Sequence, residues 1–221
     1  MGKFERGLEL LEDSDVASFE RVLADEPALS EASDVSGVSL LMHALYRRRA
    51  DLASVLAARK RSLDVFEAAS LGRLDRLSQC LRDPLAVNSQ SGDGFTALHY
   101  ACYFGQSDAV RLLLEKGAAP DAIAANPMRV MPMHSAASAR NVTAARILLE
   151  AGAPPNARQH GGWTPLHAAA QNGDRAMVEL LLQHGADPAA LNDDGKTAAE
   201  IAREKGHDEL AAHLEKRTPN P

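Results

Sequence analysis

Three histidines recur at a nearly constant spacing, and histidine is a residue that binds metal ions and transfers protons. His99, His134 and His167 are separated by 35 and 33 residues. Zinc sites usually draw their ligands from closely spaced His and Cys residues. Neither cysteine, Cys80 or Cys102, belongs to a Cys-x-x-Cys pair, and four other histidines lack such neighbours: His160, His184, His207 and His213. The sequence therefore predicts no metal site and no cofactor.

Two basic clusters are further residues that could contact a charged ligand. Residues 47–49 are Arg-Arg-Arg and residues 59–61 are Arg-Lys-Arg. We interpret them as charges at helix ends, with contact to an acidic partner as the alternative. The net charge of the whole chain is −6. This charge argues against a general nucleic-acid binder, which is expected to be basic.

Motifs of common catalytic sites are absent from the sequence. It contains no Gly-rich phosphate loop, nucleophile elbow, His-Glu-x-x-His or paired-carboxylate motif. Gly92-Asp93-Gly94 is interpreted as turn chemistry, since these residues favour chain reversals. We therefore predict that the protein is not an enzyme.

The elements that carry the histidines are predicted from helix start and stop signals. Thr164-Pro165 predicts a helix start, because Thr can cap backbone amides and Pro is tolerated at the first helical position. Gly173 is suited to ending that helix, and Asp174 to capping a second one. Gly185 then ends the second helix before a turn-prone segment. These signals predict two short antiparallel helices followed by a hairpin finger.

The same signals recur along the chain in register. The helix starts are Thr96-Ala97-Leu98-His99, Met131-Pro132-Met133-His134, Thr164-Pro165-Leu166-His167 and Thr197-Ala198-Ala199-Glu200. The first three units each continue through small residues and a Leu-rich run to a glycine: Gly117, Gly152 and Gly185. This pattern resembles the ankyrin repeat. The resemblance implies an all-α repeat solenoid of stacked helix-turn-helix ankyrin repeats with short β-hairpin fingers.

The repeat frame extends over nearly the whole chain. Positions equivalent to His99 occur at 8, 42, 66, 99, 134, 167 and 200, so the resemblance covers residues 2–217. Residues 1–217 are thus expected to form a single solenoid of about seven units. These are an N-terminal cap (1–30), degenerate repeats (31–61 and 62–87), well-matched repeats (88–121, 122–156 and 157–189) and a C-terminal cap repeat (190–217). Residues 218–221 are expected to be a disordered tail.

Departures from the frame predict local differences. The spacing between Met42 and Phe66 is only 24 residues, which leaves room for a helix-to-helix connection and predicts one missing finger. The 35-residue spacing predicts one longer finger at 122–131, with Met128 and Arg129 near its base. Ser14 and Arg48 stand where the repeat has a glycine, so altered turns are expected there.

The resemblance also implies roles for individual residues. His99, His134 and His167 are the motif histidines, whose rings tie a helix start to hairpin backbone; Thr96, Thr164 and Pro165 belong to the same motif. Ankyrin proteins usually bind partners through hairpin tips and the exposed end of the first helix. The aromatic residues in those positions are Tyr46, Phe95, Tyr103, Phe104 and Trp163, with a polar rim of Gln90, Arg129, His160, Gln171 and Asn172.

Composition agrees with this interpretation. The chain has only five Phe, three Tyr and one Trp among 221 residues, and grouped exposed aromatics are typical of binding hot spots. The alternative is that these rings cover neighbouring repeats, as expected for Phe4, Phe19, Phe66 and Tyr100. No apolar run is long enough for a membrane span or a signal peptide. We therefore expect a soluble, cytoplasmic protein.

The predicted function is non-enzymatic protein–protein interaction. The partner is expected to bind the concave face and the fingertips of a monomer that acts as adaptor, inhibitor or scaffold, without nucleic acid or membrane. Two alternatives are a small-molecule enzyme with a site in the concave groove and a purely structural subunit of a larger assembly. A deep pocket with buried ionisable groups would favour the enzyme.

Overall fold

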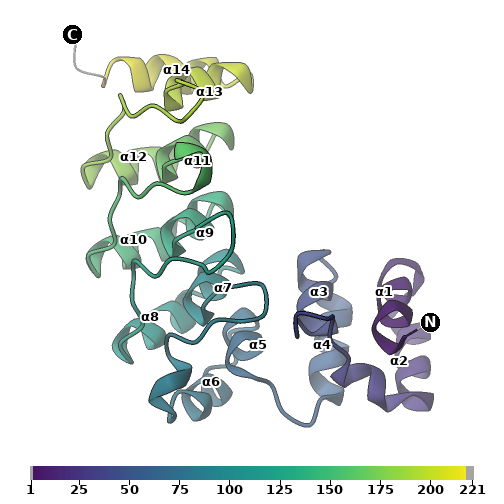
Figure 1. The fold of residues 1–221 in the computed structure, drawn as a ribbon. Coiled ribbons are helices and arrows are strands. Elements are labelled where there is room, and N and C mark those ends of the chain that lie inside the picture. The colour runs from purple at the N-terminus through teal and green to yellow at the C-terminus, as the bar shows by residue number, and fades with distance from the viewer. Residues whose placement is uncertain (1, 218–221) are drawn as a thin grey trace.

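The structure is a computed structural model that describes residues 2–217 as consecutive pairs of antiparallel helices (Figure 1). The first helices of the pairs are α1 (Lys3–Asp13), α3 (Leu40–Tyr46), α5 (Val65–Ser70), α7 (Ala97–Tyr103), α9 (Pro132–Ser138), α11 (Pro165–Gln171) and α13 (Ala198–Glu204). The second helices are α2 (Val16–Asp25), α4 (Ala50–Arg59), α6 (Leu74–Cys80), α8 (Ser107–Glu115), α10 (Val142–Glu150), α12 (Arg175–Gln183) and α14 (Asp208–Glu215). Three short 3-10 helices are η1 (Pro27–Glu31), η2 (Pro84–Ala86) and η3 (His160–Gly162). The tail expected at 218–221 lies outside the described residues.

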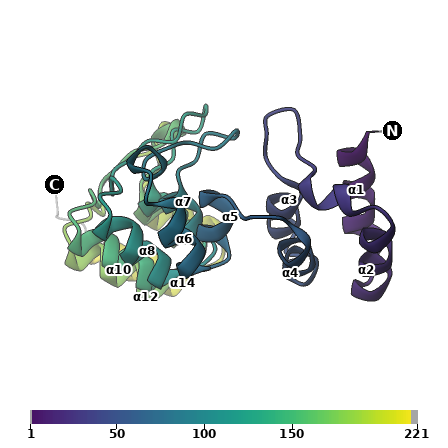
Figure 2. The same cartoon turned by 90° about the horizontal axis from the view of Figure 1, so that it is seen from below.

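The expected all-α repeat solenoid is confirmed. First helices pack against first helices along the stack, and the fingers project together from one side (Figure 2). Residues 2–217 contain isolated β-bridges, Ser33 with Ser39 and Gln90 with Thr96, but no sheet. No helix in that range has the length and apolar character needed to cross a membrane.

The turns inside the pairs follow the glycine signals, with three exceptions at Ser14, Arg48 and Arg140. Gly105 and Gly173 have φ values of 77° and 65°, in the left-handed region that glycine favours. Arg48 and Arg140 occupy the same place in their pairs and have φ values of 59°. The altered turn expected at Arg48 is therefore wrong, because the arginine adopts the glycine conformation. At Ser14 the backbone is extended instead.

Replacing Arg48 by Gly is expected to stabilise the protein by about 0.5–1 kcal/mol, because a left-handed conformation is costly for a residue with a Cβ. The urea midpoint of unfolding measures this gain. Arg48→Ala is the matched control, since it shortens the side chain but keeps the strained backbone. An equal gain from Arg48→Ala would show that the side chain, not the backbone, causes the effect.

The stack bends sharply between α4 and α5. Helices α1–α4 lie to one side of the column formed by α5–α14 (Figure 1). Residues 60–64 join α4 directly to α5, where the other units insert a finger. The fingers at 33–39 and 89–95 therefore touch: a Cβ on Gly92 would lie 1.8 Å from the carbonyl oxygen of Ser36. The missing finger thus changes the direction of the stack.

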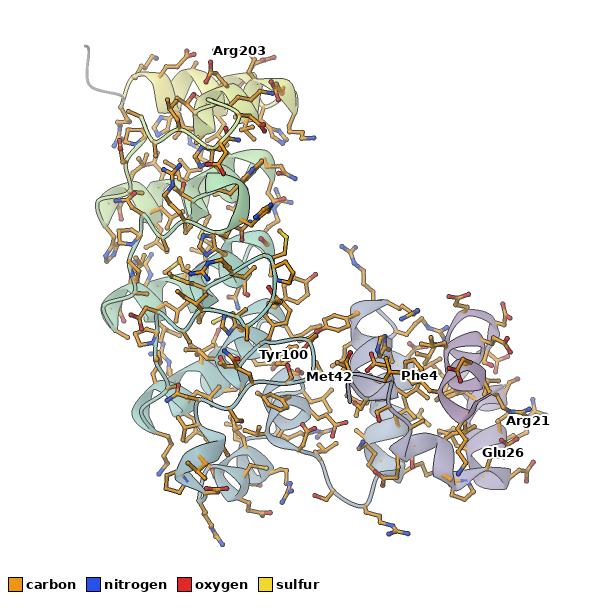
Figure 3. The ribbon with its side chains drawn as sticks, viewed as in Figure 1. Phe4, Arg21, Glu26, Met42, Tyr100 and Arg203 are labelled. Carbon is orange, nitrogen blue, oxygen red and sulfur yellow. The ribbon has the colours of Figure 1, made fainter. Side chains whose placement is uncertain are left out.

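The hydrophobic core divides at the same bend. One cluster of buried side chains runs from Val65 to Leu214, and a second contains residues 11–56 together with Tyr100. Tyr100 belongs to α7 but packs in the same cluster as Met42 of α3 (Figure 3). Leu63 and Phe66 pack against both clusters. Apolar contacts therefore couple the two parts of the stack.

A buried ion pair joins the two parts next to these apolar contacts. The Lys60 Nζ atom lies 2.9 Å from Glu67 Oε1, and the two side chains are 8% and 1% exposed. The Ser39 hydroxyl also donates to Glu67 Oε1, at 2.6 Å. The second basic cluster is thus partly internal. The same holds for the first cluster, because Arg49 donates to the carbonyl oxygens of Leu11 and Ser14.

Candidate functional site

Each motif histidine connects its own helix to the finger of the next unit. The Nε2 atom of His99 lies 2.9 Å from the carbonyl oxygen of Val130, and that of His167 lies 3.0 Å from the oxygen of Lys196. His134 makes the same contact with Ala157, at 3.1 Å. These bonds fix the position of each finger relative to the preceding helix.

The hydrogen bonds also define the charge of these rings. The Nδ1 atom of His99 accepts the backbone N–H of Thr96 at 3.2 Å, so Nε2 carries the ring proton and donates it. Thr164 and His167 repeat this arrangement, and Pro165 follows at the first helical position. Burial lowers the pKa of His99 to about 4 and also lowers the pKa of the imidazoles of His134 and His167. The motif histidines are therefore neutral near pH 7.

Backbone hydrogen bonds link successive fingers in the column. Gly94 accepts from Ala125 at 2.8 Å, Met128 from His160 at 2.9 Å, and Gly161 from Asp193 at 2.9 Å. The glycines that end the second helices, Gly117, Gly152 and Gly185, have φ values of 88°, 85° and 85°. The fingers thus form a fixed row beside the first helices.

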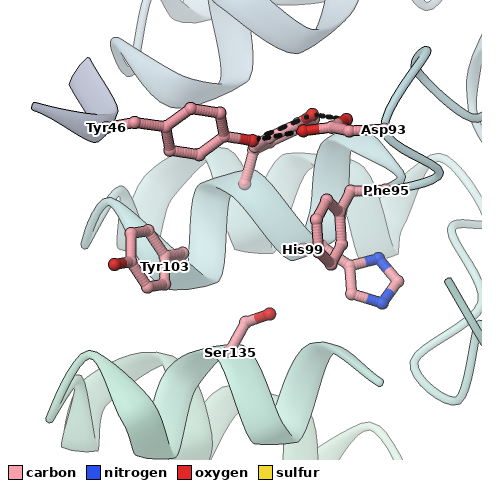
Figure 4. A pocket seen from close by; sticks show the side chains of 7 residues that line it. Tyr46, Asp93, Phe95, His99, Tyr103 and Ser135 are labelled. Carbon is pink, nitrogen blue, oxygen red and sulfur yellow. Dashed lines mark hydrogen bonds between the residues drawn. The ribbon is translucent and has the colours of Figure 1, made fainter. Parts of the chain in front are cut away.

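A pocket of about 290 Å³ lies on the inner face at the bend (Figure 4). We call it the aromatic pocket, and its lining residues are Tyr46, Asp93, Phe95, His99, Tyr100, Tyr103 and Ser135. Figure 4 shows the rings of Tyr46, Tyr103 and Phe95 on three sides, with the Ser135 hydroxyl directed toward the space between them. Helices α3, α7 and α9 therefore contribute to one hollow.

The Asp93 carboxylate holds this pocket together. The Tyr46 hydroxyl donates to Oδ2 at 2.5 Å, and the hydroxyls of Tyr100 and Ser91 donate to Oδ1. Desolvation and the neighbouring Asp93 raise the pKa of both tyrosine hydroxyls, so they remain donors. The sequence interpretation missed this role of Asp93, because its Gly-Asp-Gly setting is that of an ordinary turn.

Some of the predicted aromatic residues line the aromatic pocket, and others pack against neighbouring rings. Tyr46 and Tyr103 are 38% and 47% exposed, and Phe95 also lines the aromatic pocket. Phe104 is not among the residues that line the aromatic pocket; its ring lies 6.1 Å from that of Tyr46 and 5.2 Å from that of Tyr103. Phe104 therefore packs within the bend. Of the rings expected to cover neighbouring repeats, Phe19 and Tyr100 are buried.

A second hollow, of about 500 Å³, brings together four other predicted residues. We call it the polar hollow; its lining includes His160, Trp163, Gln171 and Asn172, together with Met128. The Asn172 amide donates to the carbonyl oxygens of Ala137 and Ser138 at the end of α9. Its amide donor is therefore engaged within the protein, whereas Gln171 and His160 are exposed.

Two predicted rim residues lie outside both hollows. Gln90 donates to the carbonyl oxygen of Ile123 in the next finger, at 3.0 Å. Arg129 is exposed and has a φ of 51°. Its backbone N–H closes a turn onto Asn126 at 3.1 Å. Met128 and Arg129 thus form the tip of the long finger, and their expected place near its base is wrong.

Side chains that could bind a metal ion do not form a cluster in the described residues. In the part of the chain that the structure describes, no three His, Cys, Asp or Glu side chains are grouped so that they could hold a metal ion. Cys102 is buried and Cys80 half-buried, and both are free thiols. The groups that converge on the inner face are rings, hydroxyls, amides and one carboxylate.

Comparison with known proteins gives one family. A family model described as "Ankyrin repeats (3 copies)" matches residues 65–159 and 152–220. The chain is 40% identical over 103 residues to the human "DNA-binding protein RFXANK", which is 45% of this chain and 39% of that protein. It is 47% identical over 58 residues to a "Transient receptor potential cation channel subfamily A member 1 homolog" of Caenorhabditis elegans, covering 26% of this chain and 5% of the channel. It is 40% identical over 50 residues to "Osteoclast-stimulating factor 1" of Monopterus albus, covering 23% of each. The matches thus span well under half of each relative.

Proposed function

The chain belongs to the ankyrin-repeat family, and we propose that it binds a polypeptide partner through the inner face formed by its first helices and fingers. Ankyrin repeats are generally protein-interaction modules, and the family is typically non-enzymatic. The observation that carries the proposal is that the aromatic pocket and the polar hollow both lie between first helices and fingers. A partner that spans both would contact apolar rings and polar groups together.

The chemistry of the two hollows supports a polypeptide as the partner. Tyr103 and Met128 are each 47% exposed, and Trp163 lines the polar hollow beside His160 and Gln171. Apolar anchors surrounded by polar groups are typical of protein interfaces. The motif histidines and the backbone hydrogen bonds between fingers hold the fingers in place. Little conformational entropy of the backbone is therefore lost on binding.

Adaptor, inhibitor and scaffold are the roles that such a face can serve. One relative is called a DNA-binding protein, but we do not extend DNA binding to this chain, because its net charge is −6. The described terminal helices carry exposed charges, among them Glu9 and Glu12 in α1 and Glu209 in α14. Charged ends stop a stack from growing, which supports a monomer.

A triple variant tests the proposed face. Tyr103→Ala, Met128→Ala and Trp163→Ala together are expected to weaken partner capture at least tenfold, because each removes an apolar contact on this face. Quantitative mass spectrometry of proteins captured by the wild-type and variant chains measures the loss. Phe104 is left unchanged, since its ring packs within the bend.

Leu85→Ala is the matched control for the triple variant. Leu85 is 83% exposed on η2, which lies away from both hollows. Its replacement is expected to leave capture unchanged. Capture of the same proteins in the same amounts by the triple variant would contradict the proposed face, provided that circular dichroism shows native helix content.

A further inference from the structure

The aromatic pocket contains a carboxylate, Asp93, that forms no ion pair with the described residues. Asp93 accepts hydrogen bonds from the hydroxyls of Tyr46, Tyr100 and Ser91. His99 in the same wall is neutral, because burial lowers its pKa to about 4. The pocket therefore has a negative charge that a ligand could balance.

The walls of the pocket are suited to a positive charge. Three rings surround the space, those of Tyr46, Phe95 and Tyr103 (Figure 4). The face of an aromatic ring attracts cations because its quadrupole places negative charge there. The Tyr46 hydroxyl donates its proton toward Asp93, which increases the electron density of the ring. The three rings and the Asp93 carboxylate thus both favour the binding of a cation in this pocket.

The pocket offers few acceptors for N–H groups. Both oxygens of Asp93 already accept hydroxyl donors, and the other polar group directed into the space is the Ser135 hydroxyl (Figure 4). A primary ammonium would bring three donors into this space and lose the water that satisfied them. Methyl groups on nitrogen replace those donors with apolar surface and keep the charge.

We propose that the aromatic pocket binds a quaternary or methylated ammonium group. The trimethylammonium group would occupy the space between Tyr46, Phe95 and Tyr103, with its alkyl chain leaving past Ser135. A methylated lysine of another protein and a free quaternary amine both present this chemistry. The assignment does not depend on the proposed partner face, because binding of a free cation would support it even if the triple variant kept every partner.

A pair of isosteric probes tests the charge directly. Choline and 3,3-dimethylbutan-1-ol have the same shape, but only choline is charged. NMR titration of the full chain is expected to show choline shifting the signals of Tyr46, Tyr103 and Ser135 with at least tenfold tighter binding than the alcohol. Equal binding of the two probes, or no shift with choline at millimolar concentration, would overturn the proposal.

Further arms separate the two sources of the group and locate the site. Blocked trimethyl-lysine is compared with blocked lysine and with choline; tighter binding of trimethyl-lysine assigns the pocket to modified protein, and tighter binding of choline to a free amine. Tyr103→Ala is expected to weaken choline binding at least tenfold, and Asp93→Asn to weaken it as well. Leu85→Ala, on η2 away from both hollows, is the control and is expected to bind choline like the wild-type chain. Unchanged binding by Tyr103→Ala would place choline elsewhere and refute the site.

Discussion

Replacing Glu67 by Ala is expected to lower the free energy of unfolding by about 3–5 kcal/mol, because the buried Lys60 ammonium loses its partner at 2.9 Å and keeps only the more exposed Glu31 carboxylate at 3.6 Å. Glu67 receives the Ser39 hydroxyl at 2.6 Å, the Lys60 ammonium at 2.9 Å and the Asp64 backbone N–H at 3.1 Å. These groups come from both sides of the bend. The loss should therefore be largest for α1–α4, which this carboxylate attaches to the column. Urea unfolding combined with segment-resolved hydrogen exchange measures both the size and the place of the effect.

Two variants show whether the buried charge is the cause. Lys60→Met with Glu67→Leu replaces the pair by apolar side chains and is expected to recover most of the lost stability. Glu204→Ala breaks an exposed pair with Lys196, which spans 2.6 Å, and is expected to cost less than about 1 kcal/mol. A similarly small cost for Glu67→Ala would mean that the pair at the bend contributes no more than a surface ion pair.

Acid is expected to destabilise the protein well before its carboxylates are protonated. Burial holds the pKa of His99 at about 4 in the folded protein and also lowers the pKa of His134 and His167. The unfolded chain therefore binds protons more readily, so the stability that neutral histidine contributes is complete above about pH 6.5 and is lost as the pH falls toward about 4. The titration of His99 alone is expected to lower the free energy of unfolding by about 3 kcal/mol over this pH range. Urea unfolding at a series of pH values measures the slope.

The variant His99→Gln identifies the source of this slope. Glutamine does not titrate, so the loss of stability per pH unit between pH 6.5 and 4.5 should decrease by up to about 1.4 kcal/mol. Hydrogen bonds from Thr197 lower the pKa of Glu200. Protonation of such carboxylates changes the stability mainly below about pH 4.5, outside the range in which the histidines titrate. An unchanged slope in His99→Gln would show that other groups carry the acid sensitivity.

The sequence predicted the repeat fold because its signals are local. Thr164 and Gly173 mark the start and end of a helix whatever surrounds them. The 24-residue spacing before Phe66 likewise indicated a shortened unit, since chain length alone limits what can be built there. Such features depend on neighbouring residues and on the number of residues between motifs, and both can be read from a sequence.

The bend and its contacts depend on residues far apart in the chain. Tyr46 and Asp93 are 47 residues apart, and only the direction taken by the stack after the missing finger brings them together. Lys60 belongs to a basic cluster that favoured an exposed position, but in the fold it faces Glu67. No residue pattern predicts an angle between units, so the aromatic pocket could not be foreseen. Arg48 shows the converse, because the surrounding turn imposes a glycine conformation on a residue that disfavours it.

The missing finger also determines how the molecule responds to force. Within residues 2–217, backbone hydrogen bonds join the finger at 89–95 to the one that follows, but none joins it to the finger at 33–39. Tension between the two ends of the chain would therefore load the side-chain contacts at the bend, such as Tyr46 with Asp93, before the row of fingers. Under the same tension, the column of α5–α14 would deform less than the bend between α4 and α5. The stiffness of the bend would depend on the contacts of Asp93 and Glu67.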